Sequence, residues 1–251
     1  MIYITGDTHA DYTRFKTANF PEQKSMTKED FVIVCGDFGI WEDTKEQNFW
    51  WDWLDAKPFT TLFITGNHSN YDLLKTYPVG SWHGGKVQFI RPSVIHLMRG
   101  QFFDLNGLSF FTMGGASCHD IQGGVLEPDD PNFKAKLRRA RMVGLPFRVN
   151  HISWWKEELP SEEEYAEARR NLDAHGWKAD CIVTHCCPTS LIAEAGDPTY
   201  KADALSDFLE EISRKADFRW WFFGHYHDNH IFRQKYVLLY EQIVALPQKI
   251  I

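Results

Sequence analysis

The chain has 251 residues, of which 43% are hydrophobic, and a formal net charge of −7. This length and composition predict a sizeable folded core and exclude intrinsic disorder. The acidic balance argues against sequence-independent binding of duplex DNA, which depends on Lys and Arg. A phosphate substrate remains possible, because bound divalent cations can be the largest local charges in a site.

Nothing in the sequence predicts a membrane or secretory protein. The first apolar run is interrupted early by Gly6 and Asp7, so no secretory signal is recognised there. No uninterrupted apolar run has the length of a membrane-spanning helix. The five cysteines are an odd number without framework spacing, which favours a reducing compartment. We therefore expect a soluble, cytoplasmic protein with no membrane partner.

Six short apolar runs recur along the chain, and each ends abruptly at a glycine or a polar residue. They cover residues 2–4, 31–35, 62–65, 110–113, 181–184 and 220–223. Runs of this length without alternation predict strands that are buried on both faces.

Helical patterns lie between these runs. A Trp-rich stretch predicts a short helix at residues 47–54, and a capping box at Ser161 and Glu164 predicts another at residues 161–172. Apolar residues at helical spacing predict a third helix at about residues 201–216. Alternating strands and helices indicate an α/β layered domain, in which ligands bind beyond the carboxyl ends of the strands. Without a linker, composition break or repeat, residues 1–251 are expected to form a single domain.

Residues 118–151 form the irregular exception and contain a basic run from Lys134 to Arg141. Long irregular segments inside a compact domain are often functional, so we expect residues 118–141 to shape the substrate pocket. At least one of Arg138, Arg139 and Arg141 would then approach a bound phosphate. The favoured alternative for the basic run is a solvated helix face.

Ligand-type side chains collect where the apolar runs end. They are Asp7, His9, Asp37, Asn67, His68, His185, His225 and His227. Carboxylate, amide and imidazole donors without thiolate suit manganese, iron or zinc. One carboxylate can bridge two ions, and in two-metal sites the ions lie ~3.5–4 Å apart. A glycine before a ligand lets the chain turn sharply and approach the metal closely.

The motif series Asp-x-His, Gly-Asp, Gly-Asn-His, a lone His and Gly-His-x-His resembles the calcineurin-like metallophosphoesterase superfamily, and in particular its small bacterial and phage members. The resemblance implies a four-layer α/β/β/α sandwich of two mixed β-sheets flanked by helices. It also implies a dimetal site: Asp7, His9 and His227 would hold the first metal, and Asn67, His185 and His225 the second. Asp37 would bridge the two ions, and His68 would act on the leaving oxygen.

Two departures from the family pattern argue against the serine/threonine protein phosphatase branch. The segment after Asp37 lacks a second Asp and an Arg, and Ser69 replaces the acid that usually follows Gly-Asn-His. The leading hypothesis is hydrolysis of a phosphomonoester or phosphodiester by in-line attack of metal-bound hydroxide. The alternatives are a nuclease or nucleotide-specific phosphodiesterase, and a non-catalytic scaffold for protein partners. Expected substrates are small phosphate esters, with nucleotides or nucleic acid also possible.

Other polar and aromatic residues receive milder interpretations. His119 and His230 follow strand-end turns and are expected to be structural or to support the ligands. Cys186 and Cys187 are expected to be small buried hydrophobes. The tryptophans are expected to pack in the core rather than to stack on bases.

Overall fold

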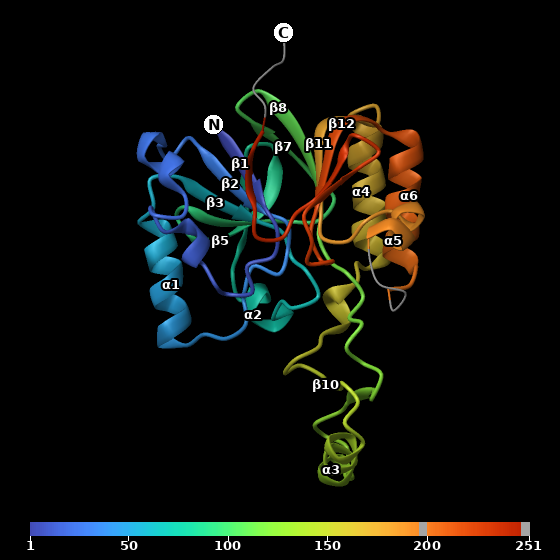
Figure 1. Cartoon of the computed structure of the whole chain (residues 1–251). Coiled ribbons are helices and arrows are strands. Elements are labelled where there is room, and N and C mark those ends of the chain that lie inside the picture. Colours follow the sequence, from blue (N-terminus) through green and yellow to red (C-terminus); the bar gives the residue numbers. More distant parts are fainter. Residues whose placement is uncertain (196–199, 247–251) are drawn as a thin grey trace.

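Two mixed β-sheets lie face to face at the centre of the computed structural model, which describes residues 1–195 and 200–246 (Figure 1). The first sheet contains β1 (Ile2–Thr5), β2 (Phe31–Val34), β3 (Thr60–Phe63), β4 (Val79–Trp82), β5 (Gly85–Arg91), β6 (Val94–Leu97) and β15 (Ile243–Ala245). The second contains β7 (Gln101–Leu105), β8 (Leu108–Met113), β11 (Lys178–Thr184), β12 (Asp217–Phe223), β13 (His230–Phe232) and β14 (Tyr236–Leu238).

Both sheets have a parallel centre and antiparallel edges. The order of the first is β15-β1-β2-β3-β6-β5-β4, and β1, β2, β3 and β6 run parallel. The order of the second is β13-β14-β12-β11-β8-β7, with β14, β12, β11 and β8 parallel. Every residue of β2 and β3 is buried, as the continuous apolar sequence of β2 predicts for a strand covered on both faces.

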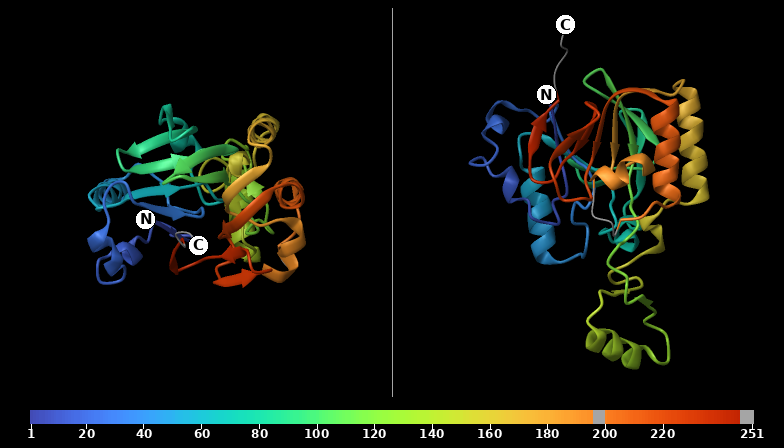
Figure 2. Two further views of the ribbon diagram at one scale, coloured as in Figure 1. Left: turned by 90° about the horizontal axis from the view of Figure 1, so that it is seen from above. Right: turned by 45° about the vertical axis from the view of Figure 1, so that its right-hand side comes forward.

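Helices cover the outer face of each sheet (Figures 1 and 2). On the first sheet lie α1 (Lys45–Asp55) and α2 (Tyr71–Lys75), and on the second lie α4 (Glu162–Ala174), α5 (Thr189–Ala195) and α6 (Ala204–Lys215). Three separate clusters of buried side chains fill the three spaces between these layers. Ile33 and Val183 belong to the cluster between the sheets, Trp51 to the cluster under α1, and Leu172 and Leu209 to the cluster under α4 and α6. The predicted four-layer sandwich of two mixed sheets is confirmed.

The predicted helices are present, with small differences at their ends. The capping box at Ser161 and Glu164 opens α4, as predicted. The third helix begins at Ala204 rather than near residue 201, because the Asp203 side chain accepts a hydrogen bond from the Ser206 amide and caps the helix there. Within the described ranges, no helix combines the length and apolar character that a membrane crossing requires.

Residues 118–152 leave the sandwich and form an extension that carries the helix α3 (Phe133–Val143) and the two-stranded pair β9 (Val125–Leu126) and β10 (Arg148–Val149). In Figure 1, α3 lies at the far end of this extension, apart from both sheets. The expectation of irregular structure is wrong for residues 133–143, which form a helix ended by the left-handed Gly144. Because Ala140 is the only residue of α3 that is buried, the interpretation of the basic run as a solvated helix face is the one that fits.

Short 3-10 helices lie at Thr13–Phe15, Pro21–Ser25 and Lys156–Glu158. Trp51 and Trp221 are fully buried, and Trp221 donates a hydrogen bond to the Thr184 hydroxyl at 2.8 Å. These two tryptophans pack in the core, as expected.

Candidate metal centre

Five strand ends from the two sheets meet at one edge of the sandwich and carry all eight predicted site residues. Asp7 and His9 follow β1, Asp37 follows β2, and Asn67 and His68 follow β3; His185 follows β11, and His225 and His227 follow β12. Since the carboxyl ends of parallel strands share an edge, two facing parallel sheets bring these loops together across their interface.

Asp7, His9 and His227 form the first donor group. Their ligand atoms all lie within 4.8 Å of one another. The Nε2 atoms of His9 and His227 are 3.0 Å apart, and His227 Nε2 is 3.2 Å from Asp7 Oδ2. Two imidazole nitrogens that face each other and a buried carboxylate are a donor set that suits a divalent cation. The His227 side chain is 46% exposed, so this group opens to solvent.

The second donor group lies deeper and centres on His185. Its Nε2 is 3.2 Å from Asn67 Oδ1 and 3.4 Å from Asp37 Oδ2. The ring of His225 lies 5.0 Å from the ring of His185, measured between centroids. Asp7, Asp37 and His185 also offer ligand atoms within 4.8 Å of one another. Asp7 therefore takes part in both groups, although the sequence-based hypothesis gives the bridging role to Asp37.

Hydrogen bonding fixes how His185 presents its ring. Its Nδ1 lies 2.8 Å from the carbonyl oxygen of Cys35, so the N–H at this position donates to the backbone. Nε2 then points at the Asn67 and Asp37 oxygens, where a neutral imidazole can offer a lone pair to a cation. Burial opposes a charge on this ring, but Asp37 and Asp7 outweigh it and raise the pKa of His185 to about 9. In the absence of a cation, a proton on His185 balances the two carboxylates.

The carboxylate of Asp37 is held ionised by the same contacts. Burial alone would raise the pKa of Asp37, but the neighbouring His185 and, more weakly, His68 and His9 hold it well below its ordinary range. Asp37 is 1% exposed. An ionised carboxylate at this depth requires positive charge around it.

The backbone at the site is strained. His9, Asp37, His225 and His227 have φ values of 45°, 43°, 71° and 50°, in the left-handed region that non-glycine residues avoid. Such conformations cost about 1–3 kcal/mol each and cluster at functional sites.

The glycines of the motifs leave room for the donors. A Cβ at Gly66 would overlap the Asp37 carboxylate and lie 2.6 Å from His185 Nε2. A Cβ at Gly224 would overlap the Asp7 carboxylate. The glycines that precede the ligands in the sequence therefore allow one strand-end turn to lie close to the donors of another turn.

His68 lies beside the donor groups. Its backbone N–H donates to Asp37 Oδ1 at 2.8 Å, and its carbonyl accepts a hydrogen bond from Trp41 Nε1 at 2.9 Å. Its ring centroid is 5.6 Å from that of His9. Burial lowers the pKa of His68, Asp37 opposes this effect, and Arg148 adds to it.

Sequence reasoning missed Arg148 and Glu158, which the extension and the 3-10 turn after it bring near His68 and Asp37. Arg148 forms an ion pair with Asp120 at 2.9 Å, and its buried Nε has no hydrogen-bond partner within residues 1–195 and 200–246. The basic run on α3 was the more visible signal in the sequence, but an isolated arginine carries no pattern.

The two histidines expected near the site have different positions. The ring of His119 lies 5.6 Å from that of His225, next to the deeper donor group. His230 is an exposed residue of β13.

The comparisons with known proteins agree with this geometry. The calcineurin-like phosphoesterase family model matches residues 1–229. The chain is similar to lariat debranching enzyme A of Xenopus laevis, with 27% identity over 158 residues, which are 57% of this chain and 28% of that protein. It is also similar to a lariat debranching enzyme of Drosophila pseudoobscura pseudoobscura, with 24% identity over 258 residues, 90% of this chain and 42% of that protein. The chain thus spans well under half the length of these curated relatives.

Among solved structures, the phosphopantetheinyl hydrolase of Mycobacterium tuberculosis is 17% identical and covers 96% of this chain and 89% of its own. Its TM-score of 0.40 is too low to bear on function.

Glu158 makes the stability of the protein depend on pH. The residue is 2% exposed, and burial, with a contribution from Asp37, raises its pKa to about 9. The folded state therefore holds a proton that the unfolded chain, with a pKa of roughly 4.3, releases. Since the folded state binds more protons, the free energy of unfolding falls as the pH rises between these two values.

We expect Glu158→Gln to remove this dependence. The difference in free energy of unfolding between variant and wild type should grow in favour of the variant from pH 5 to pH 8, by at most about 1.4 kcal/mol per pH unit. Denaturant unfolding with a chelator present measures it. Parallel stability curves for the two proteins would contradict the buried, protonated carboxyl.

Proposed function

The chain belongs to the calcineurin-like phosphoesterase family, and from this premise we propose that it is a metal-dependent phosphoester hydrolase that acts on a phosphodiester or phosphomonoester at a site for two divalent ions. The observation that carries the proposal is the pair of overlapping donor groups built around Asp7, Asp37 and His185. Manganese, iron and zinc match these oxygen and nitrogen donors.

In the proposed site, each residue keeps the role that the family resemblance implies. Asp7, His9 and His227 would hold one ion, Asn67, His185 and His225 would hold the other, and Asp37 would be shared between them. The contacts of His185 fit this assignment, because its N–H donates to the Cys35 carbonyl and its Nε2 faces the other donors. When bound, two divalent ions supply Lewis acidity and an activated water for in-line displacement at phosphorus.

His68 is proposed to protonate the leaving oxygen. Its backbone is fixed to Asp37 on one side and to Trp41 on the other, which holds the imidazole at the rim of the donor groups. A general acid must lie within hydrogen-bond reach of the atom that it protonates, and a rim position allows this without ligation.

Arg148 replaces the α3 arginines as the proposed phosphate-binding arginine. Its charge acts on His68 and Glu158, whereas Arg138, Arg139 and Arg141 are exposed on a helix at the end of the extension. A guanidinium can bind two phosphate oxygens at once. We therefore keep the expectation that this segment shapes the pocket for the part around Arg148, and abandon it for α3.

The names of the similar proteins favour a nucleic-acid substrate, since they are lariat debranching enzymes. A nuclease or nucleotide-specific phosphodiesterase is therefore the second candidate. A scaffold without catalysis is disfavoured, because all eight motif positions keep residues that can act.

The five cysteines are buried and form no disulfide, which supports the proposal of a reducing, cytoplasmic environment. We also propose that the chain forms one domain.

Asp37→Asn tests the bridging assignment. We expect turnover to be abolished and the content of both metals to fall, because an amide donates one neutral oxygen where a bridge needs two charged ones. Metal analysis after dialysis and circular dichroism measure stoichiometry and fold. Asp7→Asn is the matched control and should weaken mainly one ion. If Asp7→Asn lost both metals and Asp37→Asn mainly one, the bridging residue would be Asp7. Wild-type metal content and activity in Asp37→Asn would show that Asp37 is not the bridge.

His68→Ala tests the proton donor. A general acid contributes typically ~10²–10⁴-fold, so kcat should fall by about that factor for alkyl leaving groups, with metal content intact. The loss should shrink for nitrophenolate, which leaves without protonation. An equal loss for both kinds of leaving group would identify a structural role for the imidazole.

Arg148→Ala tests whether Arg148, rather than an arginine of α3, binds the phosphate. We expect KM for a phosphodiester to rise by about tenfold, because a charge-assisted hydrogen bond contributes roughly 1.5–3 kcal/mol. Arg138→Ala, Arg139→Ala and Arg141→Ala, with the same loss of charge, should leave KM for a small ester unchanged. Steady-state kinetics measure KM for all four variants, and an equal change of KM in all of them would refute the assignment to Arg148.

A further inference from the structure

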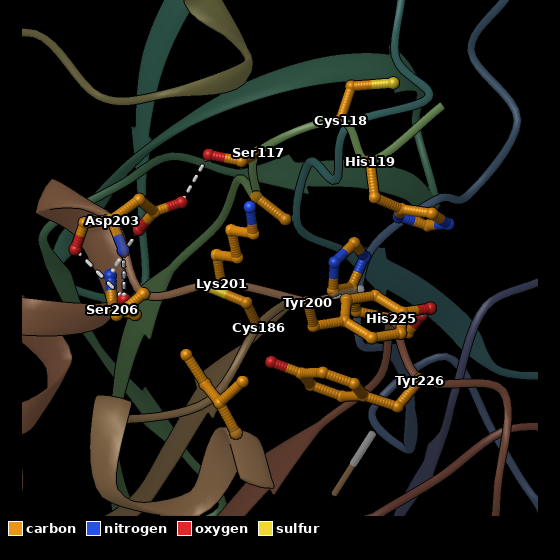
Figure 3. A pocket seen from close by; sticks show the side chains of 13 residues that line it. Ser117, Cys118, His119, Cys186, Tyr200, Lys201, Asp203, Ser206, His225 and Tyr226 are labelled. Atoms are coloured by element: carbon orange, nitrogen blue, oxygen red, sulfur yellow. Dashed lines mark hydrogen bonds between the residues drawn. The ribbon is translucent and has the colours of Figure 1, made fainter. Parts of the chain in front are cut away.

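A small pocket lies against His225, outside the donor groups (Figure 3). Its volume is about 200 Å³. At roughly 30 Å³ per water molecule, this space admits about six or seven waters. It can therefore hold one ring system with a few substituents, and an oligonucleotide cannot fit inside it.

Aromatic rings form one side of this pocket. The centroid of Tyr200 is 4.7 Å from that of His119, 4.8 Å from that of Tyr226 and 5.1 Å from that of His225. Figure 3 shows these rings gathered on the same side of the space. The rings meet at interplanar angles of 53° to 77°, so they form an aromatic wall against which a planar ring can pack.

The opposite end of the pocket is polar. The Ser117 hydroxyl donates to the Asp203 carboxylate, which also accepts a hydrogen bond from the backbone N–H of Ser206 at 2.7 Å (Figure 3). These bonds fix the carboxylate in place. Lys201 also lines the pocket and adds an amine. A ligand that stacks on the rings thus meets acceptors and a donor at its edge, which matches a heteroaromatic base better than a plain phenyl ring.

The position of the pocket relates it to the reaction. Because His225 is part of its wall, the pocket adjoins the deeper donor group, and a substituent of a phosphate held there can reach into it. His68 is not among the residues that line the pocket, so a leaving oxygen protonated by His68 would lie outside it. A phosphomonoester has one organic substituent, whereas a phosphodiester has two.

We propose that this pocket binds the base of a nucleoside whose ester bond to phosphorus is not cleaved in the reaction. The substrate would then be a nucleoside phosphodiester. The proposal rests on the proposed function, since it takes the phosphate to lie at the two donor groups. Tyr200 and His119 supply the stacking surface, and Ser117 and Asp203 supply the polar contacts to the edge of the base.

Three diesters of p-nitrophenyl phosphate test the proposal, with methyl, benzyl or thymidine 5′ as the second substituent. All share one leaving group and one charge, so only the group in the pocket differs. With manganese-loaded enzyme, kcat/KM for the thymidine ester should exceed that for the methyl ester by roughly 5- to 150-fold, the range that stacking of one base contributes. The benzyl ester should fall between the two.

Pocket variants show whether the preference arises here. Tyr200→Ala should bring the thymidine-to-methyl ratio close to one, and Tyr200→Phe, which keeps the ring, should keep most of it. Phe49→Ala removes an exposed aromatic ring on α1 and should leave the ratio at its wild-type value. If Tyr200→Ala does not fold, His119→Ala provides the same comparison.

The outcomes distinguish the pocket from the function. Hydrolysis of neither these esters nor p-nitrophenyl phosphate with manganese, iron or zinc would overturn the proposed function and the pocket together. Hydrolysis of p-nitrophenyl phosphate alone would overturn only the pocket proposal. Hydrolysis of all three at equal kcat/KM, or a wild-type ratio in Tyr200→Ala, would overturn the pocket alone. A benzyl ester as good as the thymidine ester would also overturn it, because it would show recognition of a ring without its polar edge.

Discussion

Two buried carboxylates determine the rest of this structure. Asp7 and Asp37 are each 1% exposed and lie where the ends of the parallel strands of the two mixed sheets meet. Removing an ionised carboxylate from water costs several kcal/mol even after relaxation, so each needs compensating charge nearby. Asp7 accepts hydrogen bonds from the His225 amide, and Asp37 accepts one from the His68 amide. A protonated His185 completes the balance until cations replace the proton.

Bringing these groups together costs backbone strain at the site, and the packing of the hydrophobic clusters offsets this cost. Four of the proposed ligands adopt left-handed backbone, and glycines at 36, 66 and 224 leave space that no Cβ could share with the neighbouring donors. Three separate hydrophobic clusters hold the layers together away from this edge. Because the strands are anchored by those clusters, the turns at their ends can hold strained conformations that loosely packed loops would relax.

The sequence predicts well those features that depend on short segments. Continuous apolar runs such as residues 31–35 give buried strands, and the glycine after each run marks where a donor follows. Features that depend on distant contacts are not visible in the same way. Glu158 reads as an ordinary charged residue, and its protonated state arises only from burial near Asp37. His119 and Tyr200 are far apart in the chain and become neighbours only through the second sheet. The α3 helix has only a narrow apolar stripe, formed by Phe133, Leu137 and Ala140, and the basic residues between them make its helical period hard to recognise in the sequence.

The surroundings of the site carry less negative charge than the family motifs usually supply, because two acids are absent from the motifs and the extension adds an arginine. Ser69, in place of the usual acid, is buried, and its hydroxyl accepts a hydrogen bond from the Gly66 amide at 3.4 Å, which closes the turn without adding charge. Arg148 brings a cation toward His68, and Glu158, with a pKa of about 9, is neutral at pH 7. The net charge of −7 matters less than these local groups, since exposed charges beyond about 8 Å are largely screened at physiological ionic strength. With fewer carboxylates and one added guanidinium, the immediate surroundings of the site favour an anionic ester on a protein whose overall charge would repel it.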